Sequence, residues 1–148
     1  MYQRILIAVD GSDTSGRAMQ EALQLAKNQQ ALLRVVYVVD EASIFSDTEF
    51  VDRSAIERAA IHTGHKVLEK ANKAAEAEGV FIETKMLETD SVGDKVAHAI
   101  VEEARNWPAD LIVVGTHGRK GLRHLFMGSI AEGVMRDSPV PILLVRLP

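Results

Sequence analysis

The chain has 148 residues, 47% of them hydrophobic and 26% charged. This composition is ordinary for a globular protein that can bury a core, and we expect one domain over residues 1–148. A net charge of −4 argues against a nucleic-acid-binding protein, and the absence of cysteine excludes disulfides, thiolate metal sites and a cysteine nucleophile. No signal peptide and no apolar run of bilayer length is found, so we expect a cytoplasmic protein that does not insert into membranes.

The first elements are two strands separated by a helix. Arg4–Val9 is a nearly continuous apolar run, which is typical of a strand buried on both faces of a parallel sheet. Asp10–Asp13 reads as a turn with helix-capping residues, and the apolar spacing that follows predicts a helix over Thr14–Asn28. Leu32–Val39 is the second predicted strand.

The middle of the chain begins with Asp40–Asp52, which has no clear periodicity and is predicted to be a loop. A long helix follows over Arg53–Glu78 and is ended by Gly79. Phe81–Leu87 is the third predicted strand. Ser91–Asp94 matches a capping box and predicts the start of another helix.

The last part continues the alternation of strands and helices. The third helix stops before Pro108, and Leu111–Val114 is the fourth strand. A short helix is predicted from Ser129 to about Arg136, and Ile142–Val145 is the fifth strand. The strict alternation predicts a three-layer α/β protein, with a parallel sheet covered by helices on both faces.

A glycine-rich loop lies between the fourth strand and the last helix. Glycines let a backbone approach a ligand closely, and a helix N-terminus favours anions. Arg119, Lys120 and Arg123 add cations to the same loop, so the sequence indicates a polyphosphate site. Two plainer interpretations stay open. The three cations also fit a solvated loop surface, and Ser129 with Glu132 matches a second capping box.

Asp10 is the other candidate for a ligand contact, because it follows the first strand. In parallel sheets, ligands bind at the carboxyl ends of strands, where the strand order changes direction. If the first and fourth strands are neighbours, Asp10 and the glycine loop reach one crevice. From the residues alone, capping of the first helix or shaping of the turn is the favoured explanation of Asp10.

These motifs resemble the nucleotide-binding universal stress proteins. The family signature is Gly, two residues, Gly, nine residues, Gly, then Ser or Thr, and it is matched here by Gly115, Gly118, Gly128 and Ser129. The beginning, Ile-Leu-Ile-Ala-Val-Asp-Gly-Ser, and the end, Ser-Pro-Val-Pro-Ile-Leu-Leu-Val, are also similar to the family. The resemblance implies sheet order 3-2-1-4-5, binding of ATP and a homodimer. It leaves open whether magnesium accompanies the ATP.

The resemblance also implies roles for individual residues. Asp10 would bind the ribose hydroxyls, and Val38 would bind adenine through its main chain. Ala8 and Val9 would line the base pocket, and Arg119 would lie near the phosphates. The remaining residues would hold the phosphates themselves: Gly115, Gly118, Gly128, Ser129 and Ile130.

Three functions follow as hypotheses. The first is an ATP-binding regulatory or signalling module of the stress response, with an unidentified protein partner and little or no turnover. The second is a slow ATPase or phosphotransferase. We favour binding, because the chain has no Gly-x-x-x-x-Gly-Lys-Ser/Thr motif and no group evidently placed to orient a nucleophile. The third is a structural stress protein that binds little nucleotide. We assign no catalytic residue and no metal ligand.

The fifth strand predicts how two copies would associate. In the implied order Ile142–Val145 lies at the sheet edge, and it carries no charge that would prevent pairing. We therefore expect a homodimer through this strand, with Pro139 and Pro141 limiting the pairing at its start.

Overall fold

The computed structural model describes residues 1–40, 52–89, 95–117 and 127–148. The chain order is β1 (Arg4–Ala8), α1 (Asp13–Gln29), β2 (Leu32–Val39), α3 (Arg53–Glu78), β3 (Ile82–Glu88), α4 (Lys95–Asn106), β4 (Leu111–Gly115), α5 (Ser129–Asp137) and β5 (Ile142–Val145). Every predicted strand and helix is present, and where the sequence defined both ends of an element, each end differs from the predicted one by at most one residue. The predicted capping box at Ser91–Asp94 and most of the predicted loop at Asp40–Asp52 lie outside the described residues.

The five strands form one parallel sheet in the order β3-β2-β1-β4-β5, which confirms the expected order. β1 pairs with both β2 and β4, with Ile7 opposite Val35 on one side and opposite Val113 on the other. The chain winds to β2 and β3 on one side of β1 and then crosses to β4 and β5. The strand order therefore changes direction between β1 and β4, where ligands of such sheets bind.

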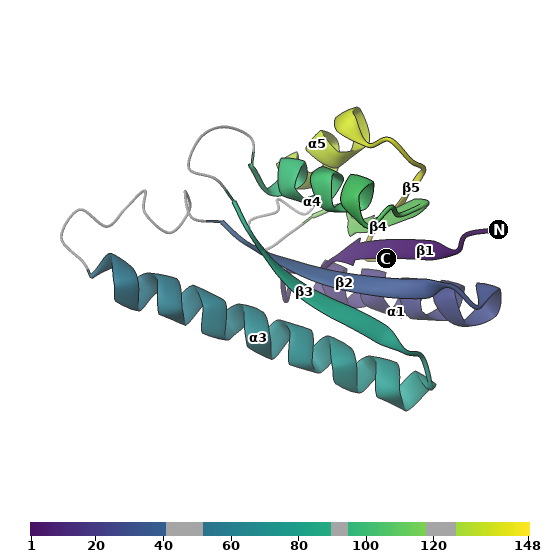
Figure 1. Ribbon diagram of the computed structural model, residues 1–148, viewed down its shortest axis with the longest axis horizontal. Coiled ribbons are helices and arrows are strands. Elements are labelled where there is room, and N and C mark those ends of the chain that lie inside the picture. The colour runs from purple at the N-terminus through teal and green to yellow at the C-terminus, as the bar shows by residue number, and fades with distance from the viewer. Residues whose placement is uncertain (41–51, 90–94, 118–126) are drawn as a thin grey trace.

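Helices cover both faces of the sheet, as Figure 1 shows, with α1 and α3 on one side and α4 and α5 on the other. Ile5 and Ile7 of β1 are completely buried against the α1–α3 layer, and Leu6 is completely buried against the α4–α5 layer. Neighbouring residues of one strand thus enter two different cores. This explains why β1 is nearly continuously apolar instead of alternating.

The ends of α1 and α3 follow the capping signals of the sequence. Ser12 accepts a hydrogen bond from the Ser15 amide (3.1 Å) and begins α1. Asp52 does the same for the amides of Ser54 and Ala55 at the start of α3, and Gly79 ends that helix with a φ of 68°.

Asp110 joins the amino ends of β1 and β4. Its carboxylate accepts hydrogen bonds from the amides of Gln3 (2.8 Å) and Arg4 (3.0 Å), and its own amide donates to the Arg4 carbonyl (2.8 Å). These bonds satisfy backbone groups at the start of two neighbouring strands. They help to hold together the strands whose opposite ends form the candidate site.

Candidate functional site

The candidate site lies at the carboxyl ends of β1, β2 and β4. Ala8 is the last residue of β1, and its partner in the sheet is Val36, so Val38 extends past the end of β1. Ala8, Val38 and Ile130 are partly buried and pack against the same α4–α5 core. The side chain of Val9 is buried in the opposite, α1–α3 core, so only the main chain of Val9 can contribute to this face.

The main chain of Val38 is oriented toward the space beyond β1. The Val36 carbonyl accepts from the Val9 amide, and the Val39 carbonyl accepts from the Thr89 amide of the β3 side. Since backbone groups of a strand alternate in direction, the N–H and C=O of Val38 point to the β1 side. Among the residues that the structure describes, neither group has a backbone partner there. An adjacent donor and acceptor are thus presented beside an apolar surface.

Asp10 shapes the turn between β1 and α1. Its carboxylate accepts from the Ser12 amide (2.8 Å), and its amide donates to the Ser15 hydroxyl (3.0 Å). Gly11 completes the turn with a φ of 85°, which favours glycine. Ser12 rather than Asp10 caps α1, so of the two plain interpretations the turn is the correct one. The turn does not exclude a ligand contact, because an ionised carboxylate can accept several hydrogen bonds.

Gly115 has a packing role that the sequence did not reveal. A Cβ at this position would lie 2.7 Å from the Cγ2 methyl of Thr14, in the first turn of α1. The end of β4 and the start of α1 therefore approach each other more closely than a side chain would permit. Packing against Thr14 is by itself sufficient to explain why residue 115 is glycine. A phosphate contact by the Gly115 backbone is compatible with this packing role.

The two ends of the glycine loop meet through a backbone hydrogen bond. The Gly128 amide donates to the Thr116 carbonyl (2.7 Å), and the Thr116 amide donates to the Val145 carbonyl of β5 (2.8 Å). Thr116 thus connects β5, β4 and the start of α5, a role that no sequence motif indicated. Gly118 and Arg119, together with Lys120 and Arg123, lie outside the described residues.

The start of α5 differs from the capping box read from Ser129 and Glu132. Gly128 is the N-cap residue and Ser129 is already in the helix, so that prediction is wrong. Among the residues that the structure describes, no side chain caps this helix end, and Ser129 is exposed to solvent. The amides of the first turn have no acceptor within the helix. They are oriented out of the helix end, close to the carboxyl end of β4.

Comparison with known proteins decides the family. A model of the universal stress protein family matches residues 1–146.

The chain belongs to the universal stress protein family.

A universal stress protein of Methanocaldococcus jannaschii is 37% identical over 148 residues, which span all of this chain and 84% of that protein. A solved structure from the universal stress protein family, from Burkholderia pseudomallei, is 36% identical with a TM-score of 0.78, covering 97% of this chain and 95% of that one. A universal stress protein crystallised in complex with cAMP is 29% identical with a TM-score of 0.67, covering 97% and 96% of the two chains.

Within the described ranges of this universal stress protein, no group of three or more histidines and carboxylates is arranged to hold a metal ion. The Thr116 hydroxyl and His117 Nδ1 lie 3.1 Å apart, which orients the imidazole at the end of β4.

In the residues that the structure describes, no helix is both long and apolar enough to span a membrane. The arrangement at the candidate site is suited to binding through backbone groups.

Proposed function

We propose that this universal stress protein binds an adenine nucleotide, with ATP as its ligand, and acts in the cytoplasm as a nucleotide-dependent regulatory module of a stress response. Family membership supports this proposal, as does the cAMP complex of a related member. The ligand would lie across the carboxyl ends of β1 and β4, at the point where the strand order reverses.

The observation that carries the proposal is the main chain of Val38. The adenine edge has an amino group that donates a hydrogen bond and a neighbouring ring nitrogen that accepts one. The carbonyl and amide of Val38 offer the complementary pair, directed beyond the end of β1. The half-buried side chains of Ala8 and Val38 provide an apolar surface beside the base.

The other proposed residues would contact the nucleotide in order, from the ribose beside the base to the phosphates. Asp10 would accept hydrogen bonds from the ribose hydroxyls. Gly128, Ser129 and Ile130 would offer amides to the phosphates, assisted by the partial positive charge at the start of α5. Gly118 and Arg119 would complete the phosphate contacts, and magnesium, where present, would be held chiefly by phosphate oxygens.

Binding of ATP with little turnover is the expected result for the purified protein. Mass spectrometry should identify co-purified adenine nucleotide, and calorimetry should detect ATP binding with and without magnesium. We expect ADP release far below about 1 per second, the low end for an ordinary enzyme. Faster release would instead indicate an ATPase or phosphotransferase, and undetectable binding would contradict the proposal.

Asp10→Asn tests the ribose contact, because the amide oxygen can still accept from Ser12. We expect about tenfold weaker ATP binding and a much smaller effect on 2′,3′-dideoxy-ATP, which lacks the hydroxyls. The matched control is Asp13→Asn, at an exposed residue in the first turn of α1. Equal losses for both nucleotides would contradict the role of Asp10.

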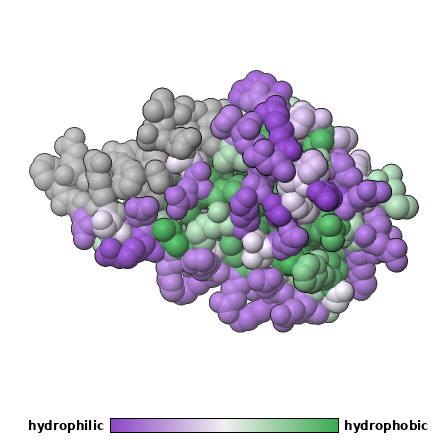
Figure 2. Space-filling model, in the orientation of Figure 1, coloured by the Kyte–Doolittle hydropathy of each residue, from purple (hydrophilic) through white to green (hydrophobic). Residues whose placement is uncertain are grey.

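We also propose a homodimer through β5, because the two sheet edges differ in chemistry. β3 carries Glu83, Lys85 and Glu88, and the face over α3 and β3 is mostly hydrophilic (Figure 2). β5 reads Ile-Leu-Leu-Val, with Met135 and Leu147 exposed nearby in the chain. An uncharged edge strand with open backbone groups favours pairing with a second copy.

Leu144→Pro is expected to convert this dimer into a monomer. The carbonyls of Pro141 and Val145 accept from β4, so the backbone groups of Leu144 point away from the sheet. Proline therefore removes an edge donor without breaking a bond to β4. Light scattering at micromolar concentration measures the result. Thr84→Pro makes the same change at the outward side of β3 and should leave the dimer intact; a monomeric wild-type protein would contradict the proposal.

A further inference from the structure

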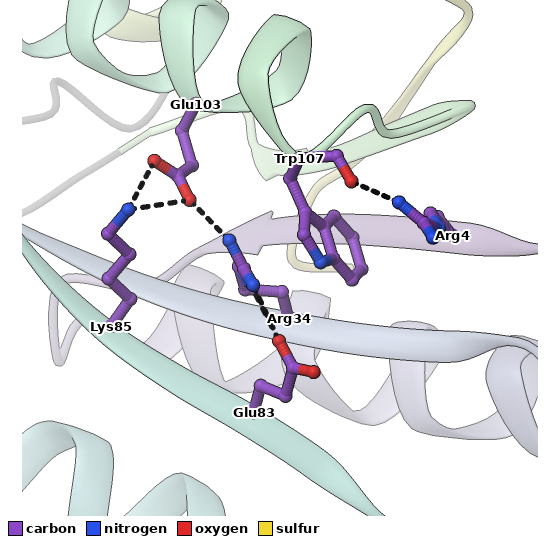
Figure 3. Close-up of polar contacts among 6 residues, drawn as sticks. All are labelled: Arg4, Arg34, Glu83, Lys85, Glu103 and Trp107. Atoms are coloured by element: carbon purple, nitrogen blue, oxygen red, sulfur yellow. Dashed lines mark hydrogen bonds and ion pairs between the residues drawn. The ribbon is translucent and has the colours of Figure 1, made fainter.

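A buried carboxylate anchors the second half of α4 to the sheet. The Glu103 side chain is only 6% exposed and accepts hydrogen bonds from Arg34 of β2 (2.7 Å) and Lys85 of β3 (3.0 and 3.2 Å), as Figure 3 shows. β2 and β3 thus each contribute one cation that binds Glu103. Unlike apolar contacts, these bonds have fixed directions and specify one position of the helix.

Arg34 extends this anchor to neighbouring groups. Its Nε and Nη2 donate to Glu83, the residue opposite Arg34 in the β2–β3 register. Its guanidinium carbon lies 4.6 Å from the centre of the Trp107 ring, which directly follows α4. Burial alone would lower the pKa of Arg34, but its hydrogen bonds and charge interactions with Glu83 and Glu103 raise it above the usual value. Arg34 therefore stays charged throughout the physiological pH range.

The first turn of the same helix packs in the core that borders the candidate base site. α4 runs antiparallel to the strands, so its start lies near their carboxyl ends (Figure 1). Ala97 is buried in the core against which Val96, Ala8 and Val38 pack. Val96 and Glu103 are roughly 10 Å apart along the helix axis. A displacement at Glu103 would reach the base site through a continuous helix.

We infer that Glu103 is a positioning residue for the base end of the nucleotide site. Apolar packing of the first turn is non-directional, whereas the bonds of Glu103 to β2 and β3 have fixed directions. The position of Val96 and Ala97 relative to Ala8 and Val38 would therefore depend on the carboxylate at the other end of the helix. This inference rests on the proposed adenine site.

Glu103→Gln tests the inference, with Glu102→Gln as the matched control. Glu102 is the preceding residue of α4, but its side chain is 41% exposed and pairs only with Arg105 among the described residues. The glutamine variant at position 103 leaves Arg34 and Lys85 around a neutral amide. We expect about tenfold faster amide hydrogen exchange over 96–100, relative to global unfolding measured in urea, and about tenfold weaker ATP binding. The control should change neither quantity.

Inorganic tripolyphosphate separates positioning from general damage, because it lacks the base. Its affinity should be unchanged in Glu103→Gln, whereas a damaged protein would lose affinity for both ligands. Adding Lys85→Gln to the Glu103→Gln variant removes the cation that has lost its carboxylate. This double variant should regain part of the protection of residues 96–100 against amide hydrogen exchange. Faster exchange confined to the surroundings of residue 103, or equal losses of ATP and tripolyphosphate, would overturn the inference. If wild-type protein binds no nucleotide, the proposed function fails, and the exchange data still decide whether Glu103 controls the first turn of α4.

Discussion

Replacing Gly128 by valine is expected to weaken ATP binding at least about 100-fold, equivalent to about 2.7 kcal/mol, without unfolding the protein. Gly128 has φ −64° and ψ 156°, which any residue can adopt, so its backbone does not require glycine. It is the N-cap of α5, directly before the amides proposed to bind phosphate. A branched side chain there would occupy the space of the phosphates. Calorimetry with ATP measures the affinity.

The same substitution at Gly16 serves as the control. Gly16 is exposed in α1, and a Cβ there would meet no atom within 4 Å. Both variants should unfold in urea close to the wild-type midpoint, and only the Gly128 variant should lose ATP binding. Gly118→Val makes the corresponding change at a second glycine of the motif. Unchanged affinity in both motif variants would contradict the phosphate site.

Replacing Gly115 by alanine is expected to lower the free energy of unfolding by about 1–3 kcal/mol, because the new methyl group overpacks the α1–β4 contact. The built Cβ lies 2.7 Å from the Thr14 Cγ2, and Thr14 is itself buried, so neither group can move away easily. Urea denaturation measures the loss. The variant also tests whether Gly115 serves packing or phosphate.

Thr14→Ser supplies the matching second change, because it removes the conflicting methyl group and keeps the hydroxyl. The double variant Gly115→Ala with Thr14→Ser should recover most of the lost stability. If Gly115 serves packing alone, the double variant should also bind ATP like wild type. No recovery of stability would show that the clash with Thr14 is not the reason for this glycine. Recovered stability without recovered affinity would assign it a phosphate role as well.

Elements with strong local signals were predicted well from the sequence. The mostly apolar run at Leu32–Val39, interrupted by Arg34, and the Asp52 and Gly79 signals around Arg53–Glu78 give the observed bounds of β2 and α3. Each depends on short-range chemistry, namely burial on both faces, an N-cap acceptor and a left-handed C-cap. Trp107 is buried directly after the end of α4. The following Pro108 predicts that the helix ends here, so packing of Trp107 at a helix end agrees with the local sequence.

Other features could not be predicted, because they depend on residues distant in the chain. The capping box predicted at Ser129 does not form, because Gly128 is the N-cap of α5. The Gly128 amide donates a hydrogen bond to the Thr116 carbonyl, on the other side of the glycine loop. Val9 and Ala8 face opposite cores because adjacent strand residues alternate, but the helices that complete each core come from distant parts of the chain. The contacts of Glu103 with Arg34 and Lys85 join three elements, and no spacing within one element reveals them.

Periodicity, capping and backbone freedom act over a few neighbouring residues, so the sequence was sufficient to predict the alternation of elements, the parallel sheet and the glycine motif. The strand order came from family resemblance, and the structure confirmed it. The three-dimensional arrangement was needed to show that Val38 extends past the end of β1 with its amide and carbonyl directed beyond that strand. It was also needed to show that Gly115 packs on Thr14 and that Glu103 binds Arg34 and Lys85. Register between strands and the docking of helices bring together groups far apart in the chain, and local sequence does not encode those distances.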